Sequence, residues 1–126
     1  MAAADRRFPA AVVDEAWRAG RLLYQVDAAG TALWPPRVAA PATGGELTWR
    51  ESAGLGTVYA ATAIHARDAE PRSVVLVELD EGFRMMSRVE GIAAEDVHVG
   101  MRVRLRFGEP DEDGARLPLF DPARET

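Results

Sequence analysis

The side chains best suited to binding chemistry in this chain of 126 residues are three arginines near its C-terminal end. Arg102, Arg104 and Arg106 alternate with apolar residues over 101–107, so a strand there would present all three on one face. A planar guanidinium binds phosphate through paired hydrogen bonds, which makes this face a candidate for contact with a phosphorylated ligand. The alternative is an exposed strand face whose charge prevents aggregation.

Side chains that could carry catalysis or bind a metal ion are scarce. The chain has no cysteine and no lysine, so thiol chemistry and a lysine Schiff base are excluded. The two histidines, His65 and His98, lie on different predicted elements and would need the fold to bring them together with a carboxylate. We therefore predict no catalytic residue and no metal site, and we expect that the chain is not itself an enzyme.

The composition bounds the class of protein. The net charge of −5 argues against generic nucleic-acid binding, which usually needs a basic surface. The longest apolar runs, such as 74–77, are too short to cross a bilayer, and no apolar segment follows Arg6 and Arg7 as a secretory signal requires. We expect a cytoplasmic protein that makes no membrane contact.

A small β-rich fold is predicted to position these residues. A helix should run from Pro9 to about Gly20, with proline in its first turn and glycine at its end. Strands are expected at 21–26, 31–34, 47–52, 56–66, 72–80, 83–90 and 101–107. The last five hide their edges best by closing into a barrel, and the OB-fold is the common five-stranded barrel. The extended, apolar tail 117–122 should lie along this barrel or against a neighbour.

The segment 26–44 has the spacing of a zinc ribbon without its ligands. Cysteines at positions 26, 29, 40 and 43 would form two C-x-x-C pairs, a strong signature of tetrahedral zinc. Val26, Ala29, Ala40 and Thr43 stand there instead. A structural zinc supplies on the order of 10–16 kcal/mol to a small ribbon, so packing must replace it. We predict a metal-free ribbon remnant that binds no zinc.

Several segments resemble, in the same order, a family of bacterial and archaeal proteins. They are 16–23 (AWRAGRLL), 35–37 (PPR), 54–59 (GLGTVY), 77–84 (VELDEGFR) and 99–101 (VGM). The family is known as the OB-fold, acyl-CoA-associated proteins, formerly domain of unknown function 35. The resemblance covers about residues 8–122 and implies a mainly β protein in three parts. These are an N-terminal helix at 8–20, a degenerate zinc-ribbon-like segment at 21–49 and a five-stranded OB-fold barrel at 50–122.

The resemblance also implies a function. Members of this family look like small partner subunits of thiolase-superfamily enzymes, which include thiolases, acyltransferases and steroid side-chain aldolases. In those systems the large subunit carries the catalytic residues and acts on acyl-CoA. The chain is therefore expected to be a non-catalytic subunit of a hetero-oligomer that stabilises its partner and helps to form the substrate channel. At the interface, the phosphates of coenzyme A would bind to Arg102, Arg104 and Arg106.

Candidates for the partner interface are large apolar side chains beyond those that a small barrel core needs, because interfaces are rich in aromatic residues and methionine. They are Trp17, Trp34, Met85, Met86, Leu119 and Phe120. The alternative for each is burial in the core.

Two further functions remain open on the sequence. A stand-alone acyl-CoA binding module would need its own apolar pocket and phosphate-binding arginines. An OB-fold that binds single-stranded nucleic acid would need exposed aromatic residues among its arginines, and Tyr59 and Phe83 are the only candidates near them. The acidic charge disfavours this last function.

Overall fold

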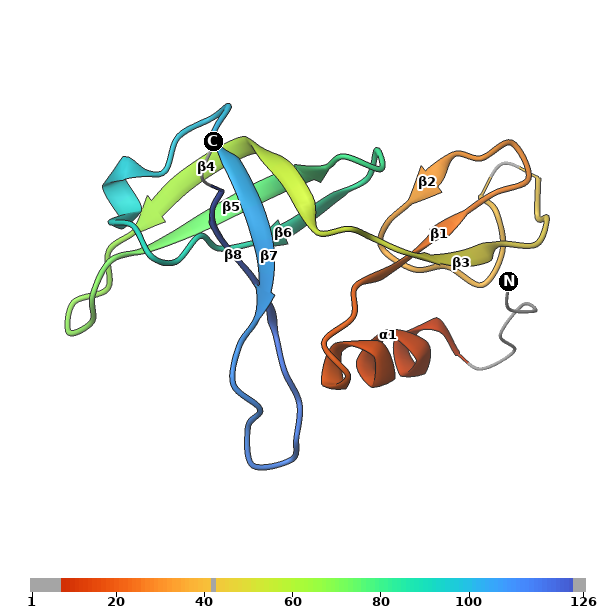
Figure 1. Ribbon diagram of the computed structural model, residues 1–126, viewed down its shortest axis with the longest axis horizontal. Helices are drawn as coiled ribbons and strands as arrows, with labels where there is room; N and C mark the ends of the chain where they lie inside the picture. Colours follow the sequence, from red (N-terminus) through yellow and green to blue (C-terminus); the bar gives the residue numbers. More distant parts are fainter. Residues whose placement is uncertain (1–7, 42, 124–126) are drawn as a thin grey trace.

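The computed structural model describes residues 8–41 and 43–123 as one helix followed by two antiparallel sheets (Figure 1). The first part comprises α1 (Pro9–Arg18), β1 (Leu23–Val26), β2 (Ala32–Leu33) and β3 (Thr48–Glu51). The second comprises β4 (Leu55–Ile64), β5 (Arg72–Leu79), β6 (Arg84–Ser87), the 3₁₀ turn η1 (Ala94–Asp96), β7 (Arg102–Phe107) and β8 (Pro118–Pro122). The prediction of a mainly β protein with an N-terminal helix is confirmed.

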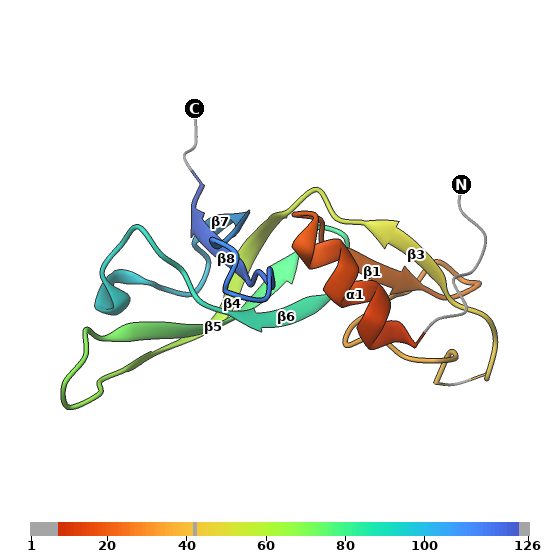
Figure 2. The same cartoon turned by 90° about the horizontal axis from the view of Figure 1, so that it is seen from below.

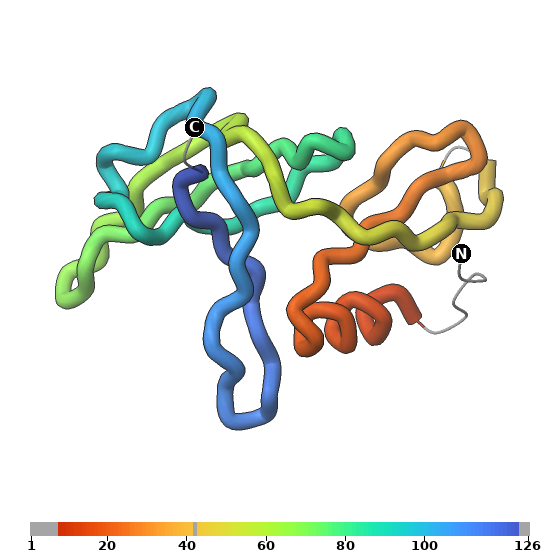
Figure 3. The backbone as a smooth tube through the Cα atoms, in the orientation of Figure 1, coloured from red at the N-terminus to blue at the C-terminus, as the bar shows by residue number. Residues whose placement is uncertain are grey.

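Helix α1 is amphipathic and lies beside the three-stranded sheet (Figure 2). Its buried residues, Val12, Val13 and Ala16, recur at the spacing of one helical face. At its C-terminal end Arg18 donates a hydrogen bond to the main-chain oxygen of Asp113. This contact ties the helix to the long loop between β7 and β8, which Figure 3 shows reaching down from the second sheet.

The second sheet is an OB-fold barrel. Its strands follow the order β6-β5-β4-β7-β8, and a parallel bridge between Val89 and Phe120 joins the two ends of this order. The main-chain nitrogen of Glu90 donates to the oxygen of Phe120 (2.8 Å), and Phe120 N donates to Arg88 O (3.1 Å). Closure by these hydrogen bonds removes the sheet edges, which would otherwise invite pairing with other chains.

Strand β6 is shorter than the predicted strand 83–90, and Ser73 of β5 explains the difference. The buried Ser73 hydroxyl accepts a hydrogen bond from Val89 N (3.0 Å) and donates to Val89 O (3.3 Å). These side-chain bonds replace the main-chain pairing of β5 and β6 beyond Ser87. The segment after Ser87 is thereby released from β5 and turns toward β8, which closes the barrel.

One predicted strand lies in a different sheet from the one expected. The segment 47–52 was assigned to the barrel, but β3 pairs with β1 in the three-stranded sheet, where Gln25 lies opposite Trp49. The tail supplies the fifth barrel strand, because β8 pairs with β7 along its whole length. Alternation of apolar and polar residues identifies a strand but not its neighbour.

Gly56 of β4 should tolerate no side chain. A Cβ atom there would lie 2.7 Å from the main-chain oxygen of Glu78 and 2.8 Å from Cγ1 of Val77. We expect Gly56→Ala to lower the free energy of unfolding by about 1–3 kcal/mol, as overpacking against a backbone does. Denaturant unfolding would measure the loss. Gly108→Ala is the control, because its nearest atom is the movable Leu119 methyl at 3.3 Å; an equal cost for both variants would contradict the prediction.

Candidate functional site

The ribbon remnant does not fit zinc. Val26, Ala29 and Ala40 offer only apolar side chains at three of the four ligand positions, and Val26 and Ala40 are buried. The hydroxyl of Thr43 accepts a hydrogen bond from Gly45 N (3.1 Å). Among residues 8–41 and 43–123, no group of three or more His, Cys, Asp or Glu side chains is placed to hold a metal ion.

Hydrogen bonds close the two turns that zinc would otherwise hold together. In the first turn, Asp27 Oδ1 accepts from Ala29 N and from Thr31 N, both at 2.9 Å. The buried amide of Gln25 crosses to the other side of the ribbon, where Nε2 donates to Arg37 O (2.8 Å) and Oε1 accepts from Arg37 N (2.7 Å). The Gln25 side chain thus provides a cross-link between β1 and the 34–46 loop without a metal.

The three-stranded sheet is further held by aromatic packing against the barrel. Phe83, in the turn between β5 and β6, stacks on Tyr24 of β1 with a centroid distance of 4.7 Å and an interplanar angle of 19°. Trp34 lies 6.0 Å from the same ring. All three belong to or pack against one hydrophobic core that includes residues of both sheets. The remnant is therefore stabilised by burial on the barrel.

A chelator should leave this protein folded. Because Gln25 and Phe83 supply the cross-links of the ribbon, we expect prolonged treatment with EDTA or phenanthroline to shift the melting temperature by less than about 1 °C, whereas a zinc-dependent ribbon unfolds. Differential scanning calorimetry, with elemental analysis of the same sample, makes the test. Stoichiometric zinc after demetallation and reloading would contradict it.

The turn between β5 and β6 also fixes the linker between the sheets. The carboxylate of Glu81 accepts hydrogen bonds from Ser52 Oγ (2.8 Å) and Ala53 N (2.7 Å). Next to it, Asp80 receives two hydrogen bonds from the Arg102 guanidinium, at 2.8 and 2.9 Å. These bonds hold the pKa of the Asp80 carboxyl below its usual range. The segment 80–83, which we call the hub turn, therefore contacts the linker, the ribbon and β7.

The three arginines predicted to bind phosphate lie on β7, and two of them are engaged by carboxylates of this chain. Arg102 pairs with Asp80 as described. Arg106 donates to Asp121 (2.7 and 3.1 Å) and to Glu90 (3.0 Å), and these carboxylates raise its pKa. Arg104 is exposed, and no ion pair is found for it within the described part of the chain. Phosphate binding at these residues stays a prediction. At Arg102 a phosphate would have to displace Asp80, and at Arg106 it would have to displace Asp121.

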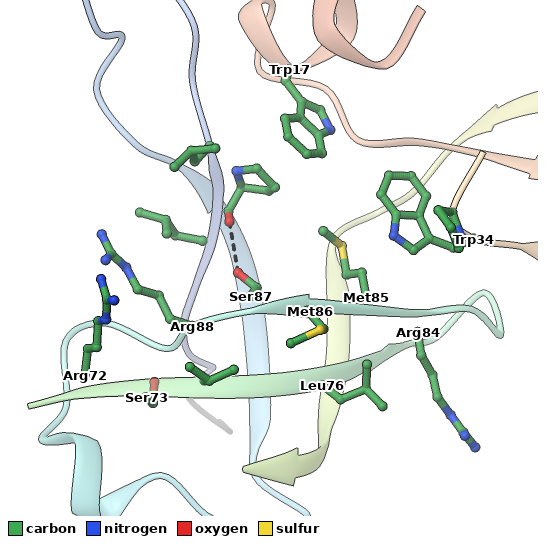
Figure 4. Close-up of a pocket in the computed structure, with 15 residues that line it drawn as sticks. Trp17, Trp34, Arg72, Ser73, Leu76, Arg84, Met85, Met86, Ser87 and Arg88 are labelled. Carbon is green, nitrogen blue, oxygen red and sulfur yellow. Dashed lines mark hydrogen bonds between the residues drawn. The ribbon is translucent and has the colours of Figure 1, made fainter. Parts of the chain in front are cut away.

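A groove of about 710 Å³ lies where α1, the ribbon and the barrel meet. Five of the six residues predicted for the partner interface line it: Trp17, Trp34, Met85, Met86 and Leu119. Figure 4 shows the indoles of Trp17 and Trp34 above Met85, with Met86 on the strand below. Phe120, the sixth, is completely buried in the barrel core, where large aromatic side chains usually lie. Met85 and Leu119 are also buried, although both border the groove.

The floor of the groove is the outer face of the β5–β6 hairpin. Leu76 pairs with Met86 in the register of the two strands, and Met86 is 69% exposed. Leu117, before β8, is 63% exposed and forms part of the wall. Neighbouring large apolar side chains at such exposure are typical of an interaction surface. We call this surface the junction groove.

Three arginines lie beside the predicted interface residues in the junction groove, a setting that the sequence did not predict. Arg72, Arg84 and Arg88 line it, and no Asp or Glu is among its described lining residues. Like Leu76 and Met86, these arginines have even residue numbers, and side chains two positions apart on a strand lie on the same face. The sequence did not show that Trp17 and Trp34 would lie over that face. Arg84 also stacks on the exposed Tyr59 ring, 3.7 Å from its centroid.

The two histidines lie apart from this groove. His65 is exposed in the loop after β4, and His98 is exposed after η1, where its Nδ1 lies 3.1 Å from Asp96 O. Neither lines the junction groove.

No described helix is long and apolar enough to cross a membrane.

Comparison with solved structures gives a match along nearly the whole chain. The structure of an Ltp2-ChsH2(DUF35) aldolase contains a chain that is 34% identical to this one, with a TM-score of 0.79. The match covers 97% of this chain and 98% of that one. The family profile for the C-terminal OB-fold domain of ChsH2 matches residues 49–108.

Two relatives in sequence are longer than this chain. A probable enoyl-CoA hydratase alpha subunit of Thermomonospora curvata is 37% identical in an alignment of 116 positions that covers 86% of this chain and 36% of that protein. A DUF35 domain-containing scaffold protein of Methanocaldococcus jannaschii is 32% identical in an alignment of 92 positions that covers 68% of this chain and 65% of that protein. The chain thus spans about one third and just under two thirds of their respective lengths. Together with the barrel topology and the match over 98% of a chain in the Ltp2-ChsH2(DUF35) structure, these similarities show that the protein belongs to the DUF35 OB-fold family.

Proposed function

We propose that this protein is a non-catalytic accessory subunit of an enzyme that acts on acyl-CoA. The observation that carries the proposal is the match over nearly the full chain to the DUF35 component of an aldolase assembly. The names of the relatives, a scaffold protein and a subunit of an enoyl-CoA hydratase, support an accessory role. The partner we propose has the thiolase fold and supplies the catalytic residues.

The junction groove is the surface that we propose for this partner. It gathers exposed Met86 and Leu117 with two tryptophans, and aromatic residues and methionine are enriched in interface cores. A partner lying over the groove would cover these side chains and convert the open groove into a closed chamber. In this arrangement the accessory subunit forms one wall of the substrate channel.

Co-purification tests this function. The tagged chain, expressed at native level in its source organism, should retain a thiolase-fold protein in stoichiometric amount, identified by mass spectrometry and sized by analytical ultracentrifugation. The purified pair should turn over acyl-CoA, whereas the isolated chain should not. Recovery of the chain as a monomer under these conditions would contradict the proposal.

A stand-alone acyl-CoA binding module is the second candidate, and one observation favours it. The junction groove combines an apolar floor with Arg72, Arg84 and Arg88, which is the combination that such a module needs. A monomer that binds coenzyme A esters by calorimetry, and that retains no partner, would replace the first function by this one.

A further inference from the structure

The junction groove has an apolar body and a cationic end. Leu76 and Met86 form the body, with the buried Met85 beside it toward the two tryptophans, whereas Arg72 and Arg88 lie together at the other end (Figure 4). Both arginines also line an adjoining pocket of about 360 Å³. A ligand in the groove would therefore meet apolar side chains along its length and positive charge at one end.

The charge at this end is opposite in sign to that of the chain. The protein carries a net charge of −5, yet the described lining of the groove has three arginines and no carboxylate. Arg84 is paired with Glu78 (3.0 Å), and Arg88 is paired through one nitrogen with Glu90 (2.9 Å). No ion pair is found for Arg72 in the described part of the chain, so its guanidinium is available to an anion.

Two hydrogen-bond donors around the groove lack acceptors. Trp17 Nε1 and Arg88 Nε are buried and make no hydrogen bond within the described residues. Buried donors are usually paired with protein, water or ligand, so each calls for an acceptor. Arg88 lies at the cationic end, where an oxygen atom of an anionic ligand would supply the acceptor. Trp17 lies at the apolar end, where an alkyl chain offers no acceptor, so only Arg88 bears on the ligand.

We propose that the junction groove binds an anionic amphiphile. Its carboxylate or phosphate pairs with Arg72 and Arg88, and its apolar chain lies over Leu76 and Met86 toward the tryptophans. The volume of the groove, about 710 Å³, lies within the range of small-molecule sites. This inference rests on the proposed function for its biological setting, since the partner would close the chamber over the ligand, but every residue that it uses belongs to this chain.

A series of decyl compounds tests the proposal on the isolated chain. Decanoate, decyl phosphate, decanol and decyltrimethylammonium are titrated below their micelle concentrations into the Trp49→Phe variant. In this variant the remaining tryptophans, Trp17 and Trp34, both line the groove, so their fluorescence reports its occupancy. We expect saturable binding of both anions, binding of decanol at least roughly tenfold weaker, and no saturable response to the cation. Comparison of the two anions shows which head group is preferred.

Arginine variants locate the head group. The double variant Arg72→Gln/Arg88→Gln should bind the two anions roughly tenfold more weakly, because the charge-assisted hydrogen bonds are lost. Its affinity for decanol should be unchanged. Arg67→Gln, an exposed arginine in the loop after β4 and outside the groove, is the matched control and should change nothing. Equal affinity for cation and anions, unchanged affinity in the double variant, or tighter binding of oligodeoxythymidylate than of decanoate would each overturn the proposal.

The failure of this inference is distinguishable from failure of the proposed function. If the chain retains its thiolase-fold partner but shows none of the expected amphiphile binding, the ligand proposal is wrong and the accessory function stands. If the amphiphiles bind as expected but no partner is retained, the ligand site stands and the accessory function is wrong.

Discussion

Phe83→Ala should destabilise the whole protein by about 3–5 kcal/mol, the cost of removing a buried phenylalanine side chain. Phe83 is 3% exposed, stacks on Tyr24 and contacts Trp34 across the boundary between the two sheets. Its removal leaves a cavity in the one core that both sheets share. We expect the melting temperature to fall by roughly 10–20 °C and the near-ultraviolet circular dichroism of the aromatic cluster to weaken.

Phe8→Ala is the matched control for this prediction. The same atoms are deleted, but Phe8 is 82% exposed, so the free energy of unfolding should change by less than about 0.5 kcal/mol. Denaturant unfolding followed by both fluorescence and circular dichroism gives the two values. A Phe83→Ala variant within 1 kcal/mol of the wild-type protein, on the same order as Phe8→Ala, would show that the stacking does not hold the ribbon.

Met86→Glu should weaken the complex with the partner enzyme by at least about a hundredfold, corresponding to roughly 2.7 kcal/mol of binding free energy. Met86 lies at the centre of the groove floor, paired with Leu76. A carboxylate there would be desolvated in the interface. Of the three arginines on this face, Arg84 and Arg88 are already paired with Glu78 and Glu90. Since Met86 is 69% exposed in the isolated chain, its stability should be unchanged. Surface plasmon resonance on the purified proteins gives the dissociation constants of the wild-type and Met86→Glu complexes, and hence their ratio.

Val99→Glu provides the comparison for Met86→Glu. Val99 is also a large apolar residue, 64% exposed, and it lies outside the groove. The Val99→Glu variant should leave the affinity for the partner enzyme unchanged. Equal losses in both variants would indicate a general effect of added negative charge, and unchanged affinity in Met86→Glu would place the partner on another face.

The helix and most strands were predictable because their periodicity is local. The alternation around Arg102, Arg104 and Arg106 gave β7 to within one residue. The partners of each strand were less accessible, since the same alternation suits either sheet. Thus β3 was placed in the barrel, and the shortening of β6 by Ser73 depends on a side chain of another strand.

The candidate site was predictable in composition but not in assembly. An excess of large apolar residues indicated Trp17, Trp34 and the two methionines, and the fold brings them to one groove. Phe120 is also a large apolar residue, but it lies in the core because β8 is a strand of the barrel. The position of Arg72 and Arg88 in a groove results from the packing of the helix and ribbon over the hairpin. Because this packing joins distant parts of the chain, no local sequence pattern predicts it.

The hub turn has a consequence for biosynthesis. A ribbon that binds zinc can fold once its own four ligands have left the ribosome, whereas this ribbon is also held by Phe83, and its linker by Glu81. Those residues are translated after β1, β2 and β3. Until then the earlier strands have their own hydrogen bonds, such as those of Gln25, but no barrel to pack against. We therefore expect the N-terminal part to stay unfolded and accessible to chaperones and proteases during translation, until the β5–β6 hairpin emerges. We thus expect this ribbon to fold late, together with the barrel, whereas a ribbon held by zinc can fold early and locally.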